Sequence, residues 1–120
     1  MAYSDTFKEH LTNPRNAGTL EGADAVAEQT NPVCGDSLRL ALRVRGGRVE
    51  AARFLAYGCP PTLVCGSALA GMLEGMTLDE AGRVTRADIA EAAGGLPPRK
   101  RHAAALAYET LNEAIKRLRT

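Results

Sequence analysis

Aromatic side chains are scarce in this chain, which has no tryptophan, two phenylalanines and three tyrosines among 120 residues. A hydrophobic core must therefore come mainly from leucine, valine and alanine, and we expect modest stability without a partner or metal. Hydrophobic residues still make up 45% of the chain and charged residues 24%, which predicts a folded protein. We expect residues 1–120 to form a single domain.

Other absences limit the possible classes of function. No apolar run approaches the ~18 residues of a membrane span, so we expect no membrane association. The formal net charge is only +1, with acids and bases interspersed, so we expect no nucleic-acid partner. The first residues lack the basic start and apolar run of a secretory signal. Three cysteines without such a signal predict a reducing, cytoplasmic setting.

The clearest periodicity is an alternation of leucines with polar or small residues over 37–45. Gly46-Gly47 follows, and residues 49–57 are a second run that suits a strand. Two such runs joined by Gly-Gly predict an antiparallel hairpin. Residues 23–29 are a weaker strand candidate.

Helical spacing surrounds this hairpin. It predicts an N-terminal helix over 3–11 capped by Ser4, a helix beginning near Pro61, two short helices over 79–84 and 86–93, and a final helix from His102. Leu96-Pro97-Pro98 predicts an extended connector before that last helix. The predicted fold class is α+β, a small antiparallel sheet packed on one face by several helices.

Residues suited to metal chemistry flank the hairpin. Cys34 and Asp36 come just before its first strand, and Cys59 comes just after its second. Because the strands run antiparallel, these three residues should meet at one end of the sheet. Gly35 and Gly58 leave room for the backbone to turn. Two thiolates and a carboxylate make a plausible metal site, while two buried structural cysteines are the alternative.

Several short motifs occur in the order and near the spacing of a known family. They are Asn13-Pro14-Arg15-Asn16, Asn31-Pro32-Val33-Cys34-Gly35-Asp36, Ala52-Arg53-Phe54, Tyr57-Gly58-Cys59, Leu78-Asp79-Glu80-Ala81, Asp88-Ile89-Ala90 and Leu96-Pro97-Pro98. On these motifs the chain resembles the IscU/NifU N-terminal family of iron–sulfur cluster assembly scaffolds along nearly its whole length. The resemblance implies a scaffold or carrier rather than a turnover enzyme. Such a protein accepts sulfur from a cysteine desulfurase, acquires iron, builds a labile [2Fe–2S] cluster and passes it to acceptor proteins.

The resemblance also implies the site residues. Cys34 and Cys59 match two of three family cysteine ligands, Asp36 matches the aspartate that keeps the cluster exchangeable, and His102 matches a histidine at the start of the last helix. These four are the implied cofactor- and metal-binding residues. The family's third cysteine would follow His102, but Ala103 stands there. The remaining set could hold a [2Fe–2S] cluster, its iron precursor or Zn²⁺.

Cys65 is a candidate replacement for the missing cysteine. We favour its packing as a small hydrophobic residue, because one to two helical turns separate it from Cys59. A relocated ligand or sulfur acceptor is the alternative.

Leu96–Lys100 resembles a segment that Hsp70-type chaperones recognise in some family members, although Arg99 replaces an apolar residue. The alternative for this segment is a rigid connector.

Three functions follow from these observations. The first is a cluster scaffold or carrier. The second is a zinc-containing, persulfide-accepting sulfur relay partner of a cysteine desulfurase. The third is a degenerate interaction module without cluster chemistry, which the missing cysteine favours and the aspartate-lined thiols oppose.

Overall fold

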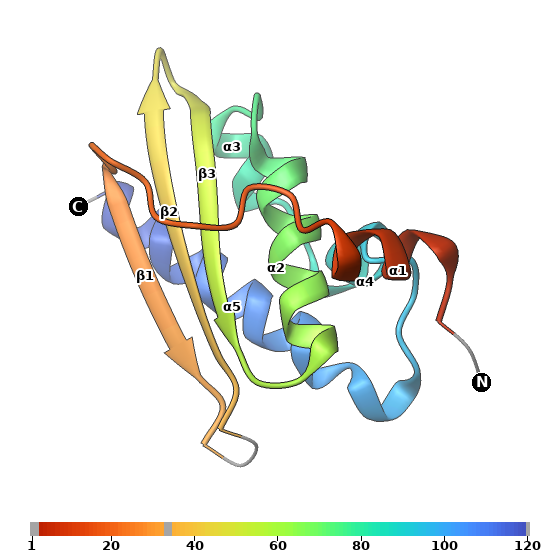
Figure 1. Cartoon of the computed structure of the whole chain (residues 1–120). Coiled ribbons are helices and arrows are strands. Elements are labelled where there is room, and N and C mark those ends of the chain that lie inside the picture. Colours follow the sequence, from red (N-terminus) through yellow and green to blue (C-terminus); the bar gives the residue numbers. More distant parts are fainter. Residues whose placement is uncertain (1–2, 33–34, 120) are drawn as a thin grey trace.

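A three-stranded antiparallel sheet and the helices packed against it organise the molecule (Figure 1). This computed structural model describes residues 3–32 and 35–119, so the predicted ligand Cys34 lies outside the described residues. The elements in chain order are α1 (Asp5–Thr12), β1 (Ala25–Thr30), β2 (Ser37–Arg45), β3 (Arg48–Tyr57), α2 (Pro60–Leu73), α3 (Leu78–Gly82), α4 (Arg86–Ala92), the 3₁₀ turn η1 (Pro98–Lys100) and α5 (His102–Leu118). The predicted α+β fold is confirmed.

The β2–β3 hairpin forms as predicted. Gly46 and Gly47 make the turn with φ values of +61° and +75°, a left-handed backbone that glycine adopts at low cost. The alternating leucines of β2 all point into the core. A β-bulge between Arg43 and Val44 interrupts the alternation, so Val44 is only half-buried.

The third strand, β1, pairs with β2 at the edge of the sheet, slightly later in the chain than predicted. The segment before it crosses the outer face of β3 and β2 (Figure 1). Gly18 donates its N–H to the Phe54 carbonyl at 2.9 Å, and the Glu21 carbonyl accepts from Arg43 at 2.9 Å. With this segment above it, Ala41 on the outer face is also buried.

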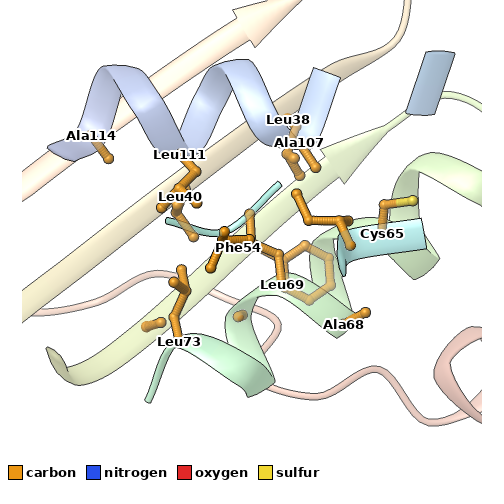
Figure 2. Close-up of a cluster of buried hydrophobic side chains, with 14 of the residues drawn as sticks. Leu38, Leu40, Phe54, Cys65, Ala68, Leu69, Leu73, Ala107, Leu111 and Ala114 are labelled. Carbon is orange, nitrogen blue, oxygen red and sulfur yellow. The ribbon is translucent and has the colours of Figure 1, made fainter. Parts of the chain in front are cut away.

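Helices α2 and α5 cover the other face of the sheet (Figure 1). Figure 2 shows part of the resulting core, where the labelled large side chains are Leu38, Leu40, Phe54, Leu69, Leu73 and Leu111. A Cβ atom on Gly66 would lie 2.6 Å from the Phe54 ring, so the absence of a side chain lets α2 lie close to β3. As the composition predicted, the core is mainly leucine, valine and alanine.

The N-terminal helix is attached to α2 by a polar contact. Ser67, which is fully buried on α2, lies 2.7 Å from Nδ1 of His10 and accepts the N–H of Arg15 at 2.7 Å. Burial, and then the positive charge of Arg15, lower the pKa of His10. The neutral imidazole can therefore accept a hydrogen bond from the Ser67 hydroxyl, while the Ser67 oxygen accepts one from the backbone N–H of Arg15.

Two short helices and a turn lead into α5. Thr77 and Thr85 begin α3 and α4 with complete capping boxes. The connector predicted to be extended over Leu96-Pro97-Pro98 is so only in part, because its last residue, Pro98, begins the 3₁₀ turn η1. No helix in the described part of the chain is long and apolar enough to cross a membrane.

Candidate metal centre

Three side chains from separate parts of the chain meet at one end of the sheet. Asp36 immediately precedes β2, Cys59 follows β3 as the N-cap of α2, and His102 is the first residue of α5. One ligand atom from each lies within 4.8 Å of the others. The hairpin thus brings Asp36 and Cys59 together as its topology predicted. The packing of α5 across the sheet adds His102.

Asp36 is the most enclosed member of this group, with 3% of its surface exposed. Its Oδ1 accepts the Cys59 N–H at 3.2 Å. Its Oδ2 accepts the Thr62 hydroxyl at 2.8 Å and the Cys59 thiol at 3.1 Å. Burial by itself would raise the pKa of Asp36, but the hydrogen bonds from Cys59 and Thr62, with nearby His102, lower it overall. The carboxyl is therefore ionised at neutral pH and able to bind a cation.

Gly58 makes room for this carboxylate. A Cβ atom at that position would lie 2.0 Å from Oδ1 of Asp36, far inside van der Waals contact. Its φ of +126° is also a backbone conformation that residues with side chains rarely adopt. The glycine before Cys59 is therefore part of how the site is built.

His102 is a more exposed member of this group than Asp36. Nε2 of His102 is 3.5 Å from Oδ2 of Asp36 and 3.9 Å from the Cys59 sulfur. The imidazole is 27% exposed and the Asp36 side chain only 5%. Helices α2 and α5 both begin at the site, so the positive ends of their dipoles lie near the Asp36 carboxylate.

Cys65 lies apart from this group, on α2 within the hydrophobic core (Figure 2). Its thiol is fully buried, and burial, followed by the charge of Cys59, raises its pKa to about 12. It is not among the clustered ligand atoms of the described residues. These observations support the packing interpretation over a relocated ligand. Ala103, where the resemblance implied a cysteine, is also fully buried.

Thr62 is a residue of the site that the sequence analysis missed. It occupies the first turn of α2, three residues after Cys59, and is fully buried. Its hydroxyl lies 3.5 Å from the Cys59 sulfur as well as 2.8 Å from Asp36. The spacing from Cys59 was a usable signal, because residues three apart lie near one another at the start of a helix.

Comparison with known proteins now assigns the family. Residues 2–120 match the model of the NifU-like N terminal domain. The chain belongs to the NifU-like N-terminal domain family. Iron-sulfur cluster assembly scaffold protein IscU 1 of Archaeoglobus fulgidus is 42% identical over 113 residues, which cover 94% of this chain and 74% of that protein. Bifunctional protein NifU/MnmA of Rubrobacter xylanophilus is 46% identical over 116 residues.

This NifU-like domain corresponds to different shares of its relatives. It matches 24% of the length of the Rubrobacter protein and 42% of the nitrogen fixation protein NifU of Cereibacter sphaeroides, which is 48% identical over 103 residues. Among solved structures, a nitrogen-fixing NifU-like protein (N-terminal) from Brucella abortus superposes with a TM-score of 0.77 at 18% identity. The match covers 97% of this chain and 93% of that one. At that identity the superposition supports the fold.

Proposed function

We propose that this NifU-like domain is an iron–sulfur cluster assembly scaffold. It accepts sulfur and iron, holds a labile cluster of the [2Fe–2S] type, and transfers the cluster to acceptor proteins. The observation that carries the proposal is the grouping of Asp36, Cys59 and His102, whose ligand atoms lie within 4.8 Å of one another. Cys34, two residues before Asp36, is proposed as the further thiolate ligand.

The chemistry of this donor set suits a cargo that must be both held and released. Thiolates bind iron strongly, whereas a carboxylate or an imidazole exchanges more readily. The ionised carboxylate of Asp36 is ready to bind without losing a proton, while the Cys59 thiol must lose one. Relatives from Archaeoglobus fulgidus and Aquifex aeolicus, named iron-sulfur cluster assembly scaffold proteins, support the same function.

The proposed partners follow from the chemistry of the cargo. A cysteine desulfurase would supply sulfur, and apoproteins with open cysteine sites would receive the cluster. An Hsp70-type chaperone is a further proposed partner through Leu96–Lys100, where Pro98 and Arg99 are exposed. We also propose that residues 1–120 act as a single domain and that the protein works in the cytoplasm.

A zinc-containing sulfur relay is the second candidate function. Sulfur, oxygen and nitrogen donors grouped as in Asp36, Cys59 and His102 suit tetrahedral Zn²⁺, and Ala103 adds no thiol to this group. In this case Cys59 or Cys34 would accept persulfide sulfur from the desulfurase.

Anaerobic reconstitution with iron, sulfide and a cysteine desulfurase separates these functions. A scaffold should bind about two irons per chain, with visible charge-transfer bands, and should transfer them to an apo-ferredoxin. Cys59→Ser should lose most of the bound iron. Cys65→Ala, the matched control, should keep it. Tightly bound zinc with stimulation of the desulfurase would favour the relay instead. If the protein neither bound metal nor stimulated the desulfurase, only an interaction role would remain.

A further inference from the structure

The hydroxyl of Thr62 bonds to a side chain distant in the sequence rather than to its own helix. Helical threonines commonly donate to a carbonyl one turn earlier in their own helix. Thr110 of α5 does so, bonding the Leu106 carbonyl at 2.8 Å. Thr62 instead donates at the same distance of 2.8 Å to a carboxylate in another part of the chain, Oδ2 of Asp36. Both threonines are fully buried, so water does not compete with either bond.

The oxygen that Thr62 binds is the one that faces the other ligands. Oδ2 of Asp36 lies 3.1 Å from the Cys59 sulfur and 3.5 Å from Nε2 of His102. The opposite oxygen, Oδ1, accepts the N–H of Cys59 at 3.2 Å. Because both oxygens accept hydrogen bonds, the rotation of the carboxylate is determined and Oδ2 is presented to the site in a single orientation.

We propose that Thr62 is a positioning residue that holds Asp36 in the orientation that binds metal and thereby strengthens metal binding. This inference rests on the proposed function and extends it to a residue that contributes no ligand atom of the clustered group. Ligating carboxylates depend on such hydrogen-bonding partners, whose loss typically weakens metal binding by about 10- to 100-fold.

The loss of the Cys59 proton on metal binding explains why the Thr62 hydrogen bond is needed to orient Asp36. In the metal-free site the Cys59 thiol donates to Oδ2 of Asp36 and helps to hold it. When Cys59 binds a metal ion, its S–H bond breaks, the sulfur keeps the electron pair for the metal, and the proton passes to solvent. That hydrogen bond is then lost. The Thr62 hydroxyl and the Cys59 N–H, which bond the carboxylate in the metal-free site, would then be the donors left to orient it.

The test measures binding of Co²⁺ alone, by its visible spectrum and by competition with a chelator of known affinity. Thr62→Val keeps the shape of the side chain and removes the hydroxyl, and we expect affinity to fall about 10- to 100-fold. Thr62→Ser should restore it. Thr110→Val is the matched control, because it removes an equally buried hydroxyl bonded at 2.8 Å, and its affinity should stay at the wild-type value.

Further measurements separate positioning from a general loss of structure. In an Asp36→Ala background, Thr62→Val should weaken Co²⁺ binding no further, because the threonine acts through the carboxylate. Thr62→Ala serves as a second variant if Thr62→Val does not fold. Wild-type affinity in the folded Thr62 variants, or an equal loss in Thr110→Val, would overturn the inference while leaving the proposed function intact. A wild-type protein that bound neither Co²⁺ nor iron would overturn both.

Discussion

Replacing Gly58 by alanine should disrupt the site from within. The added Cβ would lie 2.0 Å from Oδ1 of Asp36 and 2.6 Å from its Cγ, with the Asp36 Cα at 3.0 Å. The carboxylate cannot remain where it is, because real Cβ atoms essentially never approach other atoms below 3.0 Å. It must rotate away from the Cys59 N–H, or the backbone around residue 58 must move.

Two costs add in this variant. A side chain at φ of +126° introduces backbone strain of about 1–3 kcal/mol. Loss of the hydrogen bond between the buried carboxylate and the Cys59 N–H adds about 1–3 kcal/mol. Gly18→Ala is the matched control, because Gly18 has a φ of +131° and no atom within 4 Å of its Cβ position. It should show the strain alone, so Gly58→Ala should cost about 1–3 kcal/mol more.

Urea unfolding followed by circular dichroism measures this difference, and Co²⁺ binding measures its effect on the site. In an Asp36→Ala background the Oδ1 and Cγ atoms are gone, so the costs of Gly58→Ala and Gly18→Ala should converge. Equal costs of the two glycine substitutions in the wild-type background would refute the reasoning. An excess cost of Gly58→Ala that persisted unchanged without the carboxylate would refute it as well.

Two further predictions concern His10 and Cys65. The pKa of His10 is lowered in the folded protein from 6.5, so the folded state binds fewer protons than the unfolded state just below that pH. The contribution of neutral His10 to stability is complete above pH 6.5 and is lost as the pH falls through the folded pKa. Urea unfolding at several pH values should therefore show that His10→Gln loses less unfolding free energy on acidification than the wild type. An identical loss in the two proteins would contradict the lowered pKa of His10. Cys65, buried with a pKa of about 12, should react with a thiol reagent only on unfolding, so Cys65→Ala should remove one slow-reacting thiol and no fast one. Rapid labelling of Cys65 in the native protein would contradict its burial in the core.

The sequence predicted the hairpin well because the signal there is local. Apolar residues at every second position share one face only in a strand, and two adjacent glycines suit a tight turn. From that topology alone, Asp36 and Cys59 were expected at the same end of the sheet. The bulge at Val44 and the chain segment that covers Ala41 were not predictable, because both depend on residues distant in the sequence.

The rest of the site depended on packing between elements. His102 was placed at the site by family resemblance, since no local spacing relates it to Cys59, and its distances follow from how α5 lies across the sheet. Cys65 was ambiguous because α2 is buried on nearly all sides, so its periodicity does not distinguish a core face from a site face.

The sequence by itself therefore determined the order of elements, the hairpin and the family. These depend on periodicity and short motifs, which neighbouring residues encode. Only the tertiary structure decided that Gly58 must lack a side chain and that Thr62 bonds Asp36. Each of these depends on the approach of two elements to within a few ångströms, and that separation is set by how all the core side chains pack together.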